Sequence, residues 1–113
     1  MPEPVELVLE RRRRVLIVAF DNGQRFELPC EYLRTHSPSA EVRGHGLSEP
    51  KLLTGKALVN ISRIEPIGSY AVCLHFDDGH NTGIYSWQFL HELGVNMQAN
   101  LKRYAERLAT QPD

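Results

Sequence analysis

The sequence predicts an α+β fold, a small antiparallel β-rich domain built from two hairpin units with short helices and a C-terminal helix. Three features predict it. Short apolar segments recur, Asp-Asn-Gly and Asp-Asp-Gly separate two pairs of them, and an apolar stripe of helical period lies near the C-terminus. Strands joined by tight turns pair in antiparallel fashion, so antiparallel strands dominate the predicted fold.

The first hairpin unit begins with apolar and polar residues that alternate over residues 5–9, which is the period of a strand. Four arginines at 11–14 form the turn to a continuous apolar run over residues 15–20. Asp21-Asn22-Gly23 predicts a second turn, because Asn and Gly tolerate positive φ, and residues 24–28 form the return strand. The first strand is expected to have one strongly apolar face, made of Val5, Leu7 and Leu9.

Pro29 ends the return strand, since proline cannot donate a hydrogen bond to the ladder, and residues 30–36 are expected to form a short helix. Residues 37–56 are rich in Ser, Pro and Gly and predict a long loop. Loops of this length are usually functional or disordered, so the loop is a candidate for the functional surface.

The second hairpin unit begins with two short strands, expected at residues 58–61 and 64–67 around a polar break. Residues 69–76 form the clearest strand of the sequence. Asp77-Asp78-Gly79 predicts the turn to a return strand over residues 81–85. The apolar face of the clearest strand is expected to contain Tyr70, Val72, Leu74 and Phe76.

Two helices end the chain. Ser86 is a good N-cap for a short helix over residues 87–93, and Gly94 is expected at its C′ position. A final helix is expected to start near Asn96. Both hairpin units follow the order strand, turn, strand and short helix. Antiparallel hairpins look alike for physical reasons, and we favour this explanation of the similarity over duplication of a segment. The apolar stripe of the last helix consists of Met97, Leu101, Tyr104 and Leu108.

The composition is that of an ordinary globular protein. The 113 residues include 13 Lys and Arg against 14 Asp and Glu, for a net charge of −1. A protein that depends on phosphate contacts is usually basic, so we expect no nucleic-acid partner. The two cysteines, Cys30 and Cys73, do not form a disulfide framework and are expected to be core residues. We expect one domain over residues 1–94, with a C-terminal helix and tail over 95–113 packed on it.

The N-terminal residues lack the order of charges and apolar residues found in signal peptides, and no apolar run approaches membrane-spanning length. We therefore expect a cytoplasmic protein with no membrane contact.

The candidate catalytic patterns are weak. His75 and Asp77 match the H-x-D half of an iron site, but too few strands remain for the fold that carries it. Ser37 and Ser39 lie near histidines without the glycine-rich elbow of a serine hydrolase. The four arginines at 11–14 are more typical of a solvated turn than of a phosphate-binding site. The residues alone therefore favour a binding or accessory module over an enzyme.

Four segments carry a family resemblance: residues 32–34, 37–46, 65–72 and 76–87. Together the segments resemble the DUF971 family, the gamma-butyrobetaine hydroxylase-like N-terminal domain, over about residues 5–94. The resemblance implies a small β-rich domain. In the hydroxylases such a domain precedes the iron and 2-oxoglutarate catalytic domain, and in some plant proteins a similar domain ends an iron–sulfur carrier. We expect neither hydroxylase activity nor a cofactor here.

The family resemblance also implies a degenerate zinc site. Many members bind zinc through Cys-x-Cys-x-x-Cys and the histidine of the DGH turn. The three cysteine positions correspond here to Ser37, Ser39 and Val42, and the histidine corresponds to His80. Serine is a poor zinc ligand at neutral pH and valine is none, so we expect no tight zinc. His80 is instead expected to form a hydrogen bond to the loop backbone, to Ser37 or to Ser39.

The sequence therefore predicts a non-catalytic accessory or protein-interaction domain without a metal or catalytic site. The partner is expected to be another protein, or a small anion, that contacts Arg43, His45 and His80. Two alternatives stay open. One is a metal- or iron–sulfur-handling factor that uses His80 with loop residues, and the other is an enzyme with a site between the loop and the DGH turn.

Overall fold

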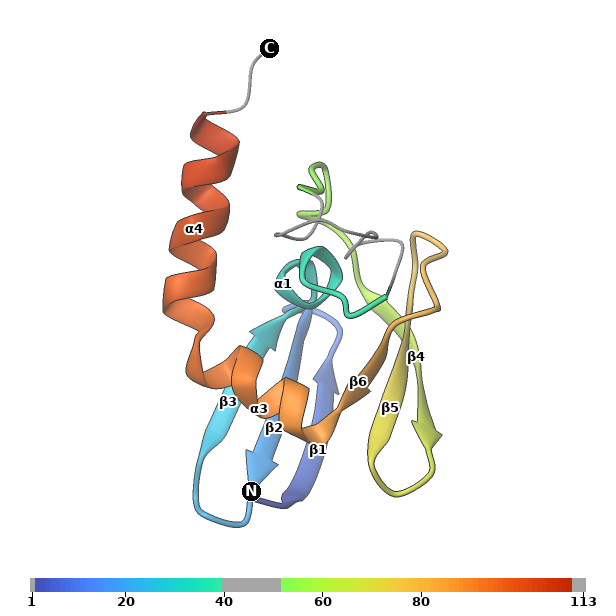
Figure 1. Ribbon diagram of the computed structural model, residues 1–113. Coiled ribbons are helices and arrows are strands. Elements are labelled where there is room, and N and C mark those ends of the chain that lie inside the picture. Colours follow the sequence, from blue (N-terminus) through green and yellow to red (C-terminus); the bar gives the residue numbers. More distant parts are fainter. Residues whose placement is uncertain (1, 40–51, 111–113) are drawn as a thin grey trace.

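The computed structural model describes residues 2–39 and 52–110. Within them the chain forms two three-stranded antiparallel sheets, in the orders β1-β2-β3 and β4-β5-β6, together with three helices. Each sheet is followed directly by a helix, and a longer helix ends the chain (Figure 1). The α+β fold class and the two hairpin units predicted from the sequence are confirmed.

The first sheet consists of β1 (Pro4–Glu10), β2 (Val15–Phe20) and β3 (Arg25–Pro29). The central strand β2 is the most deeply buried, as its continuous apolar run predicts. Helix α1 (Cys30–Thr35) begins directly after Pro29, and its Leu33 is fully buried. The observed bounds of the first sheet and of α1 agree with the predicted bounds to within a few residues.

The apolar face of β1 differs from the prediction. Leu7 and Leu9 pack against the core, but Val5 is 64% exposed. The register of β1 against β2 shifts between Pro4 and Glu6, so Val5 lies at an irregularity. An extra residue at a bulge breaks the strict alternation of faces, which explains why Val5 leaves the apolar face.

The second sheet consists of β4 (Ile61–Ile67), β5 (Ala71–Phe76) and β6 (Ile84–Ser86). The two short strands expected at 58–61 and 64–67 are wrong, because β4 is one strand with a register shift between Ile61 and Arg63. The polar residues taken for a break lie in the ladder, where Ser62 Oγ donates to the backbone oxygen of His75 at 3.1 Å.

Two further strands are shorter than predicted. Tyr70 lies in the turn before β5 and is 60% exposed, rather than on the apolar face of the strand. Gly68 in that turn has φ of +54°, so the chain reverses there and β5 begins only at Ala71. The return strand expected at 81–85 is observed as Ile84–Ser86, and Thr82 takes part in a side-chain contact described below.

The two Asp-Xaa-Gly turns have the same geometry. In one, Phe20 N donates to Gln24 O at 2.8 Å and Gly23 has φ of +89°. In the other, Phe76 N donates to His80 O at 2.9 Å and Gly79 has φ of +93°. This pattern fits a type I turn that ends in a glycine bulge, at the two positions where the sequence predicts turns.

We expect Gly79→Val to lower the free energy of unfolding by about 1 kcal/mol or more, because a β-branched residue is strained at positive φ. Nothing lies within 4 Å of a Cβ built at Gly79, so the loss reports the backbone and not a steric clash. Gly79→Asn is the control, since Asn tolerates this region and its loss should be smaller. Equal denaturant midpoints for the parent and the valine variant would show that the positive φ is not required.

The core lies between the two sheets and helices α1 and α3. Two buried tyrosines connect distant elements: Tyr32 donates to Leu93 O at 2.7 Å, and Tyr85 donates to Leu33 O at 2.5 Å. Buried tyrosine hydroxyls that find a partner add specificity to apolar packing. The largest fully buried side chains are Tyr32, Tyr85, Leu16, Ile17, Leu28, Leu33, Ile61, Leu74, Leu90, Val18 and Cys30.

Helix α3 (Trp87–Val95) begins at the predicted N-cap, where Ser86 Oγ accepts from Phe89 N at 3.0 Å. Its predicted end is wrong. Gly94 lies inside the helix, and Asn96 is the C-cap. Gly94 is required for another reason, because a Cβ there would lie 2.4 Å from Cγ of Phe26 on β3.

Helix α4 (Met97–Ala109) follows immediately and extends beside the rest of the molecule (Figure 1). Of its predicted apolar stripe, Met97 packs against the core and the Tyr104 hydroxyl donates to Leu53 O. Leu101 and Leu108 are exposed. None of the helices described is both long and apolar enough to cross a membrane.

Candidate functional site

The turn that joins β5 to β6 and the start of the long loop meet at His80. His80 is buried, and its Nε2 lies 2.9 Å from Oγ of the fully buried Ser37. Oγ of Ser37 also accepts from the backbone nitrogen of Ser39 at 3.2 Å. The hydrogen bond from His80 to the loop that the sequence analysis expects is present, with Ser37 as its partner.

A second side-chain contact joins the same two segments. The hydroxyls of Ser39 and Thr82 lie 2.7 Å apart. Gly83 is next to this contact, and a Cβ there would lie 2.5 Å from Ser37 Oγ. The glycine therefore lets the loop approach the turn closely. We call His80, Ser37, Ser39 and Thr82 the loop–turn cluster.

The charged side of the turn is organised around Asp78. Its Oδ2 lies 2.8 Å from Arg34 Nε and 2.7 Å from Lys56 Nζ, and its Oδ1 accepts from His80 N at 3.1 Å. Burial alone would raise the pKa of Asp78, but the hydrogen bonds from Lys56, His80 N and Arg34 outweigh burial and lower the pKa from 3.8 to about 2. Asp78 is thus ionised near neutral pH and holds α1, residue 56 and the turn together.

Asp77 has a separate role beside Asp78. Its Oδ1 accepts from Asn60 N at 3.0 Å, and its own backbone nitrogen donates to Asn60 O at 2.9 Å. The carboxylate is therefore used in the backbone of the turn and is not paired with His75. The iron pattern that the sequence analysis set aside has no geometric support here, because His75 contacts Glu65 instead.

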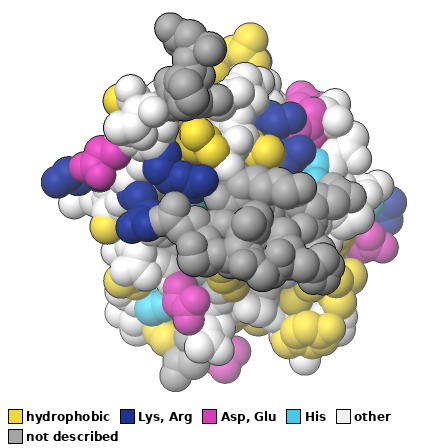
Figure 2. All heavy atoms as spheres, turned by 45° about the horizontal axis from the view of Figure 1, so that its top comes forward, with side chains coloured by type: hydrophobic (Ala, Val, Ile, Leu, Met, Phe, Trp, Pro, Cys, Tyr) yellow, Lys and Arg dark blue, Asp and Glu magenta, His cyan; other side chains and the backbone are white. Residues whose placement is uncertain are grey.

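Three of the predicted site residues, Val42, Arg43 and His45, lie outside the described residues. The structure brings together Ser37, Ser39 and His80, the others that were predicted. Figure 2, turned so that the top of Figure 1 comes forward, shows Lys and Arg side chains gathered in two places on this face. Arg34 and Lys56 provide two such charges within the turn region.

The loop–turn cluster does not suit the zinc that the family resemblance implies. Its described donors are one imidazole, two serine hydroxyls and one threonine hydroxyl, already hydrogen-bonded to protein groups. Tight zinc sites use thiolates, imidazoles and carboxylates, and a neutral hydroxyl is a weak ligand. The absence of a tight zinc at this position stays a prediction, with a direct test.

We expect the loop–turn cluster of the parent to hold no tight zinc, because hydrogen bonds and not a metal hold the loop to the turn. The combined variant Ser37→Cys, Ser39→Cys and Val42→Cys should bind one tight zinc with His80, and its melting temperature should then fall on chelation. Adding His80→Ala to that variant is the control and should remove the tight site. Tight zinc in the parent that is lost on His80→Ala would contradict the expectation.

Two features of the surface were not predicted from the sequence. The arginine turn is not merely solvated: Arg11 Nη2 donates to Ser62 O and Arg14 Nε donates to Leu58 O, both at 3.1 Å. The two bonds connect the first hairpin to β4 and to the segment before it. The second feature is a cluster of Glu65, Cys73 and His75 on the second sheet. The register of β4 against β5 brings these three residues together, and no local sequence motif indicates it.

These features define a class: a small α+β domain of two β-meanders, each followed by a helix, in which a loop is held against a DGH turn. The family model of the gamma-butyrobetaine hydroxylase-like N-terminal domain matches residues 7–91. The chain belongs to this family, which is also called DUF971. No curated protein matches the chain.

Solved structures share the fold. One, determined by NMR in solution, is 51% identical with a TM-score of 0.83, and the match covers 96% of this chain and 81% of the other. A second NMR structure is 39% identical with a TM-score of 0.83, and the match covers 97% of this chain and 86% of the other. A crystal structure of a DUF971 protein of unknown function from Acidithiobacillus ferrooxidans is 37% identical with a TM-score of 0.70, covering 81% and 92%.

Proposed function

We propose that the protein is a non-catalytic, cytoplasmic accessory domain that binds another protein through the surface formed by its long loop and the DGH turn. The observation that carries the proposal is the loop–turn cluster. Side chains of the protein itself fix the start of the loop to a rigid sheet, through His80 with Ser37 and Ser39 with Thr82. Binding residues are commonly presented on loops held in this way.

The arrangement of the hydroxyl and imidazole groups supports a structural over a catalytic role. Ser37 and His80 could form a nucleophile and base by distance alone. Ser37 is fully buried, however, and its oxygen already accepts from Ser39 N. A nucleophile must reach its substrate, so we assign the pair to holding the loop.

The chemistry of the partner follows from the charges around the turn. Arg34 and Lys56 share the carboxylate of Asp78, and Asp77 adds a second carboxylate to the turn, so the described charges balance and any positive excess comes from the loop. Arg43 and His45 follow in the loop sequence. Such a group of side chains suits an acidic segment of a partner protein, or a small anion.

The test is a comparison of variants of the full chain used as bait in native extract. Arg43→Ala and His45→Ala should each lose partners that the parent retains, with unchanged melting temperatures. Arg25→Ala is the matched control, because Arg25 is an exposed arginine in the first sheet and should keep every partner. His80→Ala, scored only if circular dichroism shows it folded, should lose the same partners.

Retention of every native partner at parental strength in all three variants would place the interaction surface elsewhere. Chemical-shift mapping with the captured protein then gives an independent readout. Shifts confined to the DGH turn and the loop support the proposal, and shifts confined to the first sheet contradict it.

A further inference from the structure

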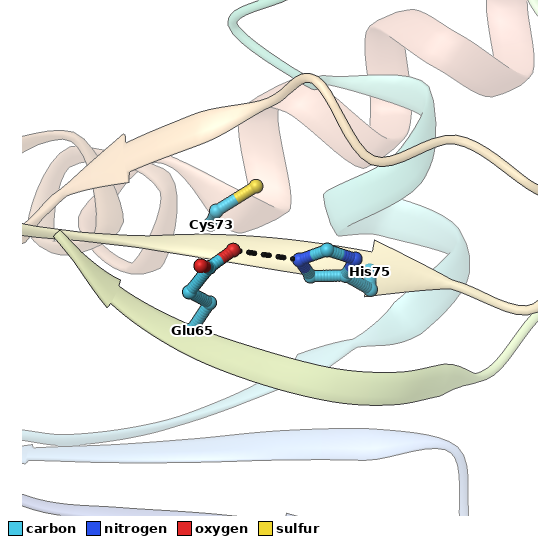
Figure 3. Close-up of side chains that lie close together, drawn as sticks. All are labelled: Glu65, Cys73 and His75. Carbon is cyan, nitrogen blue, oxygen red and sulfur yellow. Dashed lines mark hydrogen bonds and ion pairs between the residues drawn. The ribbon is translucent and has the colours of Figure 1, made fainter.

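We propose that Glu65, Cys73 and His75 form a binding site for a divalent transition metal of the zinc class on the outer face of strands β4 and β5. The three side chains gather at one place along the paired strands (Figure 3). The site is separate from the loop–turn cluster, and the inference does not depend on the proposed function.

Strand register brings the three ligands together. Glu65 on β4 lies directly opposite Cys73 on β5 in the antiparallel ladder. Residues opposite one another share a face of the sheet, and His75 follows Cys73 by two positions, so all three side chains lie on the same face. Leu74, which lies between the two ligands of β5, is fully buried on the other face. The ligands are thus carried by a rigid ladder and not by a loop.

The distances are close to those that a metal requires. Nε2 of His75 lies 3.0 Å from Oε1 of Glu65, and the three candidate donor atoms all lie within 4.8 Å of one another. Metal–ligand bonds of about 2.0 to 2.3 Å in tetrahedral geometry place neighbouring donors roughly 3.3 to 3.8 Å apart. The half-exposed Glu65 side chain can supply most of the small adjustment by rotation.

The donor set is the one that zinc prefers. An imidazole nitrogen, a thiolate sulfur and a carboxylate oxygen are all common zinc ligands, and a thiolate favours zinc over magnesium or calcium. On binding, the Cys73 thiol loses its proton to solvent, and its sulfur exchanges the present hydrogen bond to Asn81 O for the metal. One thiolate and one carboxylate then balance the charge of a divalent ion.

A neighbouring side chain orients one of the ligands. Arg63 Nη2 lies 3.9 Å from Oε2 of Glu65, whereas Oε1 of the same carboxylate faces His75. The carboxylate therefore presents one oxygen to the metal position and the other to the guanidinium, an arrangement that favours monodentate binding. Outer contacts of this kind commonly position metal ligands.

Three protein ligands leave one tetrahedral position open. Closed structural zinc sites use four protein ligands, whereas sites with three keep a position for water or an incoming group. Cys73 is buried and only 6% exposed, whereas the side chains of His75 and Glu65 are 23% and 43% exposed, so a metal can enter from the side of His75 and Glu65. We infer an accessible and exchangeable site, which is best tested by adding metal to chelator-treated protein.

The experiment titrates the chelator-treated full chain with Co²⁺, which reports thiolate ligation by a sulfur-to-metal charge-transfer absorption, and then displaces it with Zn²⁺. We expect one Co²⁺ per chain with that absorption, and its loss as Zn²⁺ is added. Cys73→Ala should abolish the absorption. His75→Gln and Glu65→Gln should each weaken Zn²⁺ binding at least about tenfold, since even outer contacts contribute that much.

Cys30→Ala is the matched control, because Cys30 is the only other cysteine in the sequence, and this variant should keep the absorption. His80→Ala should also keep it, which separates this site from the loop–turn cluster. Circular dichroism confirms that each variant is folded, and Cys73→Ser replaces Cys73→Ala if the alanine variant is not. Failure of the parent to show the absorption, or its persistence without Cys73, would overturn the inference.

Discussion

Replacing Gly94 with alanine is expected to lower the free energy of unfolding by about 1 to 3 kcal/mol, the usual range for overpacking a core. A Cβ at this position would lie 2.4 to 2.7 Å from three ring atoms of Phe26, closer than real contacts allow. The crowded atoms include Cγ, at the base of the ring, so a change of ring orientation does not relieve the contact. Thermal or urea denaturation measures the loss.

A second substitution makes this prediction sharper. In a Phe26→Ala background the crowding is removed, and alanine is the better helix former by about 1 kcal/mol. Gly94→Ala should therefore destabilise the parent but stabilise the Phe26→Ala variant. The same sign in both backgrounds would show that the close approach of α3 to β3 does not determine the residue at position 94.

Gly94 illustrates what the sequence could and could not predict. A glycine after a helical segment is a common C′ residue, and the local sequence favoured that interpretation. The actual requirement comes from Phe26, far away in the chain, on a strand against which the helix packs. Local sequence predicts the existence of α3 and its serine cap correctly, but the reason for a glycine at position 94 lies in a contact with β3.

Strand β4 shows the same limit in a sheet. Residues on the outer face of a sheet can be polar without interrupting a strand, so Ser62 and Arg63 resembled a break. The turns that join strands were predicted more reliably, because positive φ at Gly23 and Gly79 depends on local chemistry alone.

The two candidate sites differ in how far the sequence could predict them. The bond between His80 and Ser37 follows from the family resemblance, which pairs the DGH turn with the loop. Glu65, Cys73 and His75 match no local motif, and their contact depends on the register of β4 against β5. The turn at Gly68 fixes that register, so recognising the turn would have placed Glu65 opposite Cys73.

Asp78→Asn is expected to lower the free energy of unfolding by about 2 kcal/mol at neutral pH, because it removes the anion shared by Arg34 and Lys56. Nη1 of Arg34 is buried without a hydrogen-bond partner among the described residues, so its guanidinium depends on this carboxylate. The substitution leaves the turn intact. Asn22 occupies the same position of the first turn, where its Oδ1 accepts from Gln24 N at 3.0 Å just as Oδ1 of Asp78 accepts from His80 N.

The pH dependence of stability isolates the charge of Asp78. Its pKa is about 2 in the folded protein, below the 3.8 of an unperturbed aspartate. The stabilisation is therefore fully present above pH 4 and is lost as the pH falls toward 2, and it amounts to about 2 kcal/mol at 1.36 kcal/mol per pH unit. Urea denaturation of the parent and of Asp78→Asn should give curves of stability against pH that differ near neutrality and converge near pH 2.

Asn22→Asp is the matched control, because it adds a carboxylate at the equivalent position of the first turn, where the side chain is exposed. This variant should change the free energy of unfolding by less than about 0.5 kcal/mol. A constant difference between parent and Asp78→Asn from pH 7 to pH 2 would show that the ionised carboxylate does not hold the turn to α1.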